Sequence, residues 1–150
     1  MASRLGRPFT DLDERIEAQA GESVGAIFAT RGEAAFRTLE REALLTLNDV
    51  PPSIIACGGG AIVSDANRAS LKEMGYIVYL EVSAAETLAR IGDAQTRPLL
   101  AEGGLQAATT LLNARQRLYE AVADVTIDTT AGDRAFVVER VCEAIEQAGV

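Results

Sequence analysis

The sequence predicts an α/β protein in which a parallel β-sheet forms the middle of three layers and helices cover both of its faces. Short apolar runs alternate with longer segments of helical periodicity, and no internal repeat is found in the 150 residues. Ligands of such sheets bind at the carboxyl ends of the strands, so the residues that follow each strand are the first candidates for function.

The first half of the chain is expected to contain two strands and four helices. The strands are expected over residues 7–10 and 53–57, and the helices over residues 11–20, 23–31, 33–47 and 65–74. Gly21 and Gly32 interrupt the helical pattern, and Ser23 is placed to cap the second helix. The second strand is mostly apolar and stands next to glycines, which is typical of a buried parallel strand.

The second half is expected to contain two strands and three helices. The strands are expected over residues 76–82 and 124–128, and the helices over residues 84–91, 105–122 and 134–148. Ser83 and Glu86 form a capping box, and Asp133 caps the last helix. A polar, glycine-rich loop over residues 92–104 lies between the first two of these helices, and loops of this length are usually functional or mobile.

Composition excludes several classes of function. The chain has 22 acidic and 14 basic residues and a net charge of −8, which argues against a general nucleic-acid binder. It has no histidine, which excludes serine–histidine and cysteine–histidine catalysis and the common zinc sites. Cys57 and Cys142 predict reduced thiols in a cytoplasmic protein, and no segment reads as a membrane span or a secretory signal. We expect one domain over residues 1–150.

Carboxylates, arginines and glycines are the remaining candidates, and each has a plain structural alternative. Asp11 and Asp13 at a strand end could hold Mg²⁺ and accept a proton, or only cap a helix. Glu40 could orient Arg37 toward a ligand carboxylate, or the two could form a solvated surface pair.

The glycine run and the later arginines complete the set of candidates. Gly58, Gly59 and Gly60 follow a strand and suggest a backbone that passes very close to another group; the alternative is a tight turn. Arg97 in the loop could neutralise phosphate, and Arg115 could be either functional or a surface cation.

Together these segments resemble the shikimate kinase family. The resemblance is carried by Arg4-Leu5-Gly6-Arg7-Pro8-Phe9-Thr10-Asp11-Leu12-Asp13, Gly32-Glu33-Ala34-Ala35-Phe36-Arg37-Thr38-Leu39-Glu40, Cys57-Gly58-Gly59-Gly60-Ala61, Arg97-Pro98-Leu99-Leu100 and Arg115-Gln116-Arg117-Leu118-Tyr119. Their order and spacing fit the family over nearly the whole chain. The resemblance implies a P-loop kinase-like fold and phosphoryl transfer from ATP to the 3-hydroxyl of shikimate, in aromatic amino acid biosynthesis.

The resemblance also implies a role for each candidate residue. On the substrate side, Asp13 holds the shikimate hydroxyl and acts as the base, Arg37 and Arg115 bind the shikimate carboxylate, and Glu40 steadies Arg37. Backbone amides are offered to the substrate by Gly58, Gly59 and Gly60. On the nucleotide side, Asp11 helps to position Mg²⁺, Arg97 reaches the ATP phosphates from a lid over residues 92–104, and Arg90 lies near the adenine. A monomer without a nucleic-acid or membrane partner is expected.

One family motif is not found in this sequence. The phosphate loop G-x-x-x-x-G-K-[ST] does not occur, and neither does the strand that precedes it in the family. That strand lies in the middle of the family's sheet, so we expect a gap there, which a partner chain could fill. Two hypotheses follow: an amino-truncated shikimate kinase, weakly active or inactive as it stands, or a non-catalytic relative that binds shikimate-like acids or a partner. A related small-molecule kinase, such as a gluconate kinase, is a third.

Overall fold

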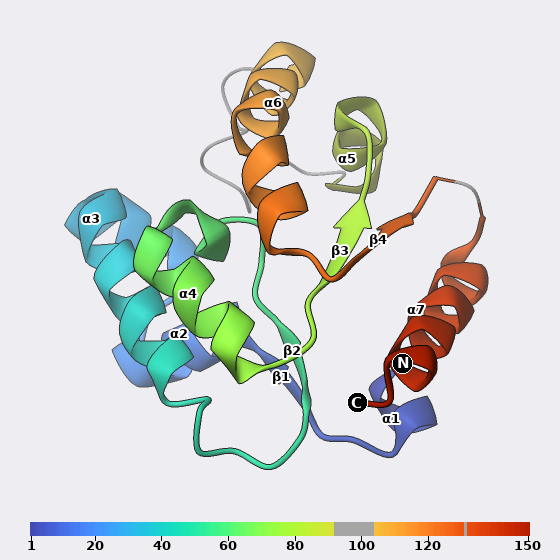
Figure 1. Ribbon diagram of the computed structural model, residues 1–150. Coiled ribbons are helices and arrows are strands. Elements are labelled where there is room, and N and C mark those ends of the chain that lie inside the picture. Colours follow the sequence, from blue (N-terminus) through green and yellow to red (C-terminus); the bar gives the residue numbers. More distant parts are fainter. Residues whose placement is uncertain (92–103, 131) are drawn as a thin grey trace. The chain divides into compact units, whose positions relative to one another are not determined.

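The computed structural model describes residues 1–91, 104–130 and 132–150, and it combines parallel strands with helices (Figure 1). Its contacts divide the chain into two compact units, Ala2–Met74 and Gly75–Val150, here called the N-terminal and C-terminal units. The single domain expected from the sequence stays a prediction. The expected lid over residues 92–104 lies outside the described residues except for Gly104.

The helices and strands follow the predicted order. The N-terminal unit contains α1 (Ala2–Leu5), β1 (Phe9–Asp11), α2 (Leu12–Ala20), α3 (Val24–Leu45), β2 (Ile54–Ala56), the 3₁₀ helix η1 (Ala61–Val63) and α4 (Asp65–Met74). The C-terminal unit contains β3 (Val78–Glu81), α5 (Ala84–Ile91), α6 (Gly104–Val122), β4 (Val125–Asp128) and α7 (Arg134–Ala148). The short helices α1 and η1 were not predicted.

Local signals set the helix boundaries in the N-terminal unit. Gly21 ends α2 in the left-handed conformation with φ 72°, and the Ser23 hydroxyl accepts a hydrogen bond from the Ala26 amide at 3.2 Å at the start of α3. Gly32 has φ 80° and ψ 173° inside α3, so the helix is broken at the predicted position. The segment after this break carries Arg37 and Glu40.

The strands pair in parallel, as predicted. In the described residues they form two two-stranded sheets, β1 with β2 and β3 with β4. No residue of β2 is fully buried, so the expectation of a buried strand is wrong. Each strand has one hydrogen-bonded neighbour in its sheet, which leaves it less enclosed than a strand in the middle of a wider sheet.

The core of the N-terminal unit lies between α2 and α3. Its buried side chains are Leu12, Ile16, Ile27, Phe36, Ala43, Leu44, Leu47 and Ala61. The helical periodicity of the sequence predicts five of them, Ile16, Ile27, Phe36, Leu44 and Leu47. The rings of Phe28 and Phe36 lie 4.7 Å apart across the break in α3. This core fixes the helical segment that carries Arg37.

The C-terminal unit has its own caps and packing. The Ser83 hydroxyl accepts from the Glu86 amide at 3.1 Å, and the Asp133 carboxylate accepts from the Phe136 amide at 2.9 Å. The rings of Tyr79 on β3 and Tyr119 on α6 stack at 4.8 Å. Among the described helices, none has the length and apolar character that crossing a bilayer requires.

Candidate functional site

Two parallel strands bring the first predicted residues to one edge. Asp11 and Ala56 are register partners at the carboxyl ends of β1 and β2, so the segments that follow them leave the sheet side by side. One leads into α2 with Asp13, and the other into the three glycines. A Cβ built on Gly58, which has φ 66°, would lie 3.8 Å from Asp13 Oδ2. The structure therefore places Asp13 against the glycine turn.

Asp11 is the N-cap residue of α2. Its Oδ1 atom accepts hydrogen bonds from the Asp13 amide at 2.9 Å and the Glu14 amide at 3.4 Å. The structural alternative for Asp11, helix capping, is thus confirmed for one of its two carboxylate oxygens. A Mg²⁺ role, which stays a prediction, would fall to the other oxygen.

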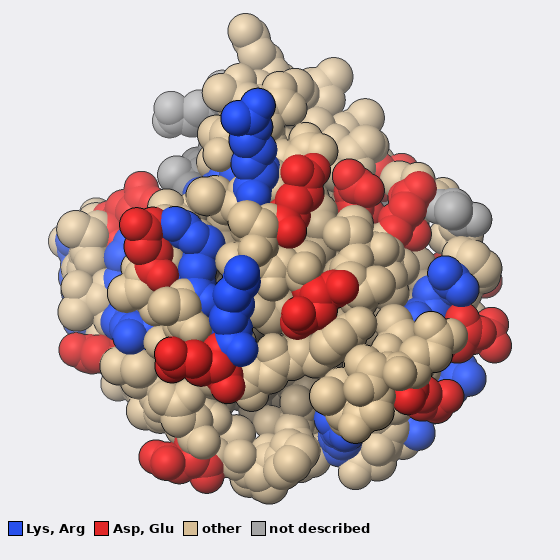
Figure 2. Space-filling view, viewed as in Figure 1, with Lys and Arg blue, Asp and Glu red and all other residues tan. Residues whose placement is uncertain are grey.

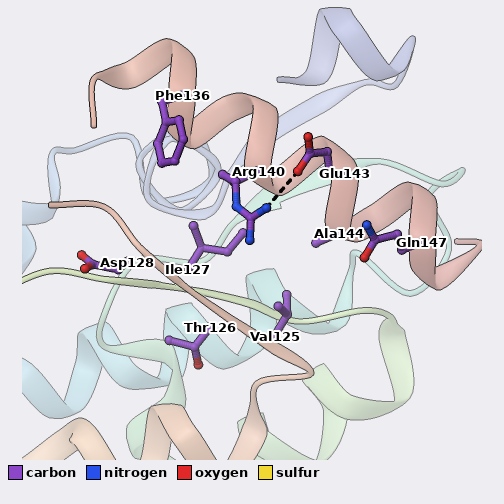
Figure 3. Close-up of a pocket in the computed structure, with 9 residues that line it drawn as sticks. All are labelled: Val125, Thr126, Ile127, Asp128, Phe136, Arg140, Glu143, Ala144 and Gln147. Carbon is purple, nitrogen blue, oxygen red and sulfur yellow. Dashed lines mark hydrogen bonds and ion pairs between the residues drawn. The ribbon is translucent and has the colours of Figure 1, made fainter. Parts of the chain in front are cut away.

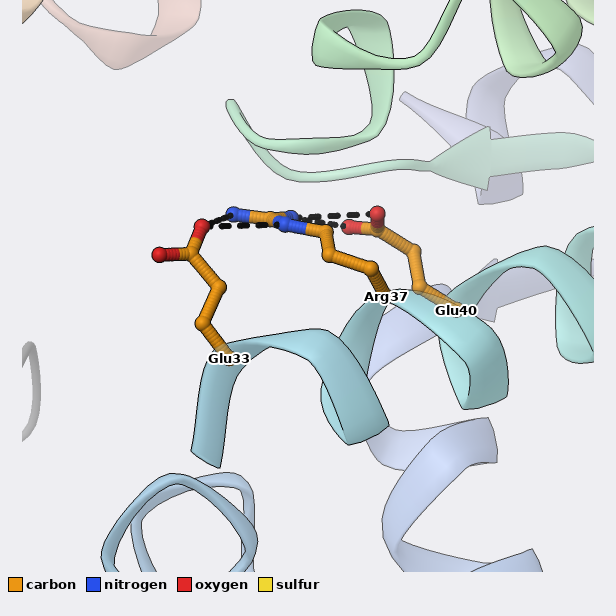
Figure 4. A network of polar contacts seen from close by, with 3 residues as sticks. All are labelled: Glu33, Arg37 and Glu40. Atoms are coloured by element: carbon orange, nitrogen blue, oxygen red, sulfur yellow. Dashed lines mark hydrogen bonds and ion pairs between the residues drawn. The ribbon is translucent and has the colours of Figure 1, made fainter. Parts of the chain in front are cut away.

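Arg37 is held between two carboxylates of its own helix (Figure 4). Glu33 Oε1 accepts from Arg37 Nε at 3.2 Å and from Nη2 at 2.9 Å, while both oxygens of Glu40 lie 3.0 Å from Nη1. The Glu40 side chain is 3% exposed and that of Arg37 is 22% exposed. The alternative of a solvated Arg37–Glu40 surface pair is therefore wrong, because Glu40 is buried.

The third glycine lies directly against this guanidinium. A Cβ on Gly60 would come within 2.5 Å of Arg37 Nη1 and 3.2 Å of Nη2 and Cζ. The sequence predicted that the glycine run passes close to another group, and at Gly60 that group is Arg37. The Arg37 guanidinium carbon also lies 5.3 Å from the centre of the Phe36 ring.

The charges around this site shift two pKa values. Burial lowers the pKa of Arg37, but its hydrogen bonds and charge attraction to Glu33 and Glu40 outweigh burial, and the net pKa is raised. Cys57, at the end of β2, has its thiol pKa raised to about 11, mainly by burial and further by the negative charges of Glu40 and Asp11. The arginine thus stays charged and the thiol stays neutral near pH 7.

The other predicted residues belong to the C-terminal unit. Arg115 lies half-buried on α6, and Arg117 is exposed on the same helix. Arg90 lies in α5, but its side chain is outside the described residues, as is the whole of Arg97. The convergence of Arg115 on Arg37 stays a prediction, since the structure describes the two units separately.

A cavity of about 280 Å³ opens in the C-terminal unit between β4 and α7 (Figure 3). It is lined by Val125, Thr126, Ile127, Asp128, Phe136, Arg140, Glu143, Ala144 and Gln147. Arg140 and Glu143 pair at 3.1 Å within it. No residue of the predicted substrate site lines this cavity, so its chemistry differs from that of the Arg37 cluster.

The donor set bears on which ions the site could hold. Within residues 1–91, 104–130 and 132–150, no group of three or more acidic or cysteine side chains is gathered as metal ligands. Asp11 and Asp13 are hard oxygen donors of the kind that Mg²⁺ takes together with water and phosphate oxygens.

Acidic and basic side chains are interspersed on the face shown in Figure 2.

Sequence reasoning missed Glu33. The residue stands four positions before Arg37, which is the spacing at which a helical glutamate and a following arginine meet. The spacing signal was therefore present, but Glu33 was read only as part of the family motif.

Comparisons with known proteins point to one family. The family model "Shikimate kinase" matches residues 1–146. The shikimate kinase of Paracidovorax citrulli is 40% identical and aligns with 100% of this chain and 84% of its own length. That of Salinibacter ruber is 50% identical, over 66% of this chain and 49% of its own length.

Solved structures show the same fold. The structure of shikimate kinase from Acinetobacter baumannii in complex with shikimate superposes with a TM-score of 0.93 at 36% identity, covering 98% of this chain and 83% of the other. Shikimate kinase from Bacteroides thetaiotaomicron gives a TM-score of 0.83 at 29% identity, over 99% and 88% of the two chains. This chain belongs to the shikimate kinase family.

Proposed function

We propose that the chain binds shikimate at the carboxyl ends of β1 and β2 and serves the transfer of a phosphoryl group from ATP to the 3-hydroxyl of shikimate. The observation that carries this proposal is the Arg37 guanidinium, held by Glu33 and Glu40 against Gly60. A fixed guanidinium is the group that grips a ligand carboxylate through two parallel hydrogen bonds. The similar Acinetobacter baumannii protein was solved in complex with shikimate.

The other residues of this edge complete the proposed site. Asp13, beside Gly58, is the base that accepts the proton from the shikimate hydroxyl as it attacks phosphorus. The amides of Gly58, Gly59 and Gly60 bind substrate oxygens. Arg115 supplies the second cation for the carboxylate. These assignments use two cations and one carboxylate, which suits a substrate that is both an acid and an alcohol.

The nucleotide side of the reaction rests on fewer residues. Phosphoryl transfer depends on positioning and charge neutralisation at the phosphates. We assign Arg97 to binding the ATP phosphates and Arg90 to contacting the adenine. The second Asp11 oxygen would hold a water molecule of a bound Mg²⁺, and that ion would neutralise phosphate charge. The 150 residues contain no G-x-x-x-x-G-K-[ST], so the backbone cradle of the phosphates is not among them.

We therefore separate binding from turnover in the proposal. The 150-residue chain binds shikimate, and it phosphorylates shikimate slowly, because the loss of even one preorganised active-site donor costs about 10²–10³-fold in rate.

The protein acts in the cytoplasm as a monomer.

Shikimate binding to the purified chain tests the proposal. Shikimate is expected to raise the midpoint of thermal unfolding, while shikimate methyl ester, which lacks the carboxylate charge, is expected to have a much smaller effect. Asp13→Asn and Arg37→Met should each weaken the protection. Equal protection by acid and ester, or none by shikimate, would contradict the assignment of this site.

Turnover is measured separately as ADP release that depends on shikimate. The expected result is a rate at least 10²-fold below that of a relative that contains the phosphate loop, measured under the same conditions. A rate equal to that of the relative would show that the phosphate loop is dispensable for this chain.

A further inference from the structure

Glu33 occupies an edge of Arg37 that Glu40 does not reach. Arg37 has five N–H donors, of which Glu33 Oε1 accepts two, from Nε at 3.2 Å and from Nη2 at 2.9 Å. Of the Arg37 nitrogens, Glu40 binds Nη1, through both of its oxygens at 3.0 Å. Figure 4 shows the two carboxylates on opposite sides of the guanidinium.

We propose that Glu33 is a positioning residue that fixes the plane of the Arg37 guanidinium for the ligand carboxylate. This inference rests on the proposed function of the same site. Glu40 anchors one nitrogen and leaves Nε and Nη2 without a bond from its carboxylate. The bonds from Glu33 to Nε and Nη2 reduce the tilting of the guanidinium that this single anchor allows, so that the remaining N–H groups keep one direction.

The surroundings of Arg37 make its orientation matter. Gly60 leaves no room for a Cβ next to Nη1, and the Phe36 ring lies 5.3 Å from Cζ. A guanidinium close to both groups presents its donors to a ligand in a narrow range of directions. Two parallel hydrogen bonds to a carboxylate require both donors to point the same way.

Exposure separates the roles of the two glutamates. The side chain of Glu33 is 51% exposed, whereas that of Glu40 is 3% exposed. An exposed ion pair adds little to the stability of the fold, so Glu33 can be removed without unfolding the chain. Loss of Glu33 should therefore appear in ligand binding and leave the unfolding transition almost unchanged.

Glu33 also carries a negative charge, which opposes an anionic ligand. The charge is exposed and screened by salt, so its repulsion is small at physiological ionic strength. The orientation effect acts on two direct hydrogen bonds to a charged group and is the larger of the two. The two effects have opposite signs, so an experiment can separate them.

Three variants test this assignment. Glu33→Ala removes the acceptor and the charge, Glu33→Gln keeps an acceptor oxygen without the charge, and Glu42→Ala removes an exposed charge from the same helix. By isothermal titration we expect Glu33→Ala to weaken shikimate binding about tenfold, Glu33→Gln to weaken it less, and Glu42→Ala to leave it unchanged. Unchanged or tighter binding by Glu33→Ala would overturn the proposal.

A second measurement needs no ligand and keeps the test independent of the proposed function. In ¹⁵N NMR spectra of the ligand-free chain, the Nε–H group of Arg37 should show slow solvent exchange and restricted motion in the wild type and in Glu42→Ala. Both properties should be lost in Glu33→Ala. If they persist there, Glu33 does not position Arg37, whether or not the wild type binds shikimate.

Discussion

Gly60 lies against the Arg37 guanidinium so closely that a Cβ at position 60 would stand 2.5 Å from Nη1. The backbone of Gly60 has φ −96° and ψ −24°, a conformation that any L-residue adopts readily. Among the described contacts it is therefore the guanidinium that requires glycine at this position, which ties the third glycine to the arginine rather than to the turn.

Gly60→Ala is expected to weaken shikimate binding more than it destabilises the fold. The added methyl group must shift the flexible end of Arg37, which misdirects the guanidinium but keeps its charge next to the Glu40 carboxylate, so the unfolding free energy changes little. A loss equivalent to one charge-assisted hydrogen bond, about 1.5–3 kcal/mol, corresponds to about 10–100-fold weaker binding. Titration calorimetry and urea unfolding of the same preparation measure the two effects.

Gly25→Ala is the matched control for that variant. A Cβ on Gly25 meets nothing closer than Ser23 Oγ at 4.0 Å, and the residue lies in the first turn of α3. It should leave binding unchanged and raise the unfolding free energy by about 0.4–1 kcal/mol. Equal shikimate affinity in Gly60→Ala and the wild type would mean that Arg37 is not the carboxylate ligand.

Arg37→Met is expected to destabilise the chain by about 3 kcal/mol. The substitution keeps the length of the side chain but takes the Arg37 charge away from the Glu40 carboxylate, which is 3% exposed. Urea unfolding at pH 7 measures the loss. A loss of this size is expected when a buried ion pair is broken, whereas breaking a solvent-exposed pair would cost much less.

The double variant Arg37→Met with Glu40→Gln identifies the cause. A neutral amide is much less costly to bury than a carboxylate that has lost the Arg37 charge, so the second substitution should restore part of the stability. If the double variant is less stable than Arg37→Met alone, the buried charge is not the origin of the loss.

The order of the elements could be predicted because its signals are local. Gly21 and Gly32 interrupt helices through conformations that other residues rarely adopt, and Ser23 and Asp133 cap them through their own side chains. The apolar periodicity of α2 and α3 then identified part of the core, such as Ile16, Ile27 and Leu44. Each of these signals involves residues within about one turn of one another, so it can be recognised from the local sequence alone.

The contacts between distant segments could not be predicted in the same way. The spacing between Arg37 and Gly60 does not show that a guanidinium rests on that glycine, and nothing in the sequence near Glu40 indicates that it is buried. The half-buried state of β2 depends on how many strands flank it. The family resemblance indicated that Arg37 binds the shikimate carboxylate. The structure gives the physical reason for glycine at position 60, which is that a Cβ there would collide with the Arg37 guanidinium.

Gly32→Ala tests the break that separates the two segments of α3. Gly32 has φ 80° and ψ 173°, a region that is essentially restricted to glycine, so alanine should cost about 1–3 kcal/mol of unfolding free energy. Gly75→Ala is the control, because a Cβ there meets nothing within 4 Å and no left-handed φ is needed. If the two variants are equally stable, the break in α3 is not held by glycine.

We expect the unfolding free energy of the chain to fall in alkali because of the Cys57 thiol. Its pKa is raised to about 11, mainly by burial and then by the charges of Glu40 and Asp11, whereas an unfolded thiol titrates near pH 8.5. The folded chain thus holds this proton more tightly than the unfolded chain. The contribution is complete below about pH 8.5 and is lost as the pH rises through about 11.

Alkylation by iodoacetamide in a Cys142→Ala background reports this thiol alone, since these are the only two cysteines. The rate should rise with a midpoint well above pH 8.5, and the same chain in urea, where the three causes vanish together, should return to the ordinary midpoint. Glu40→Gln, which removes one of the two charges and leaves burial in place, should lower the folded midpoint only in part. A folded midpoint near pH 8.5 would mean that Cys57 is open to solvent and that the end of β2 is not closed over by the core.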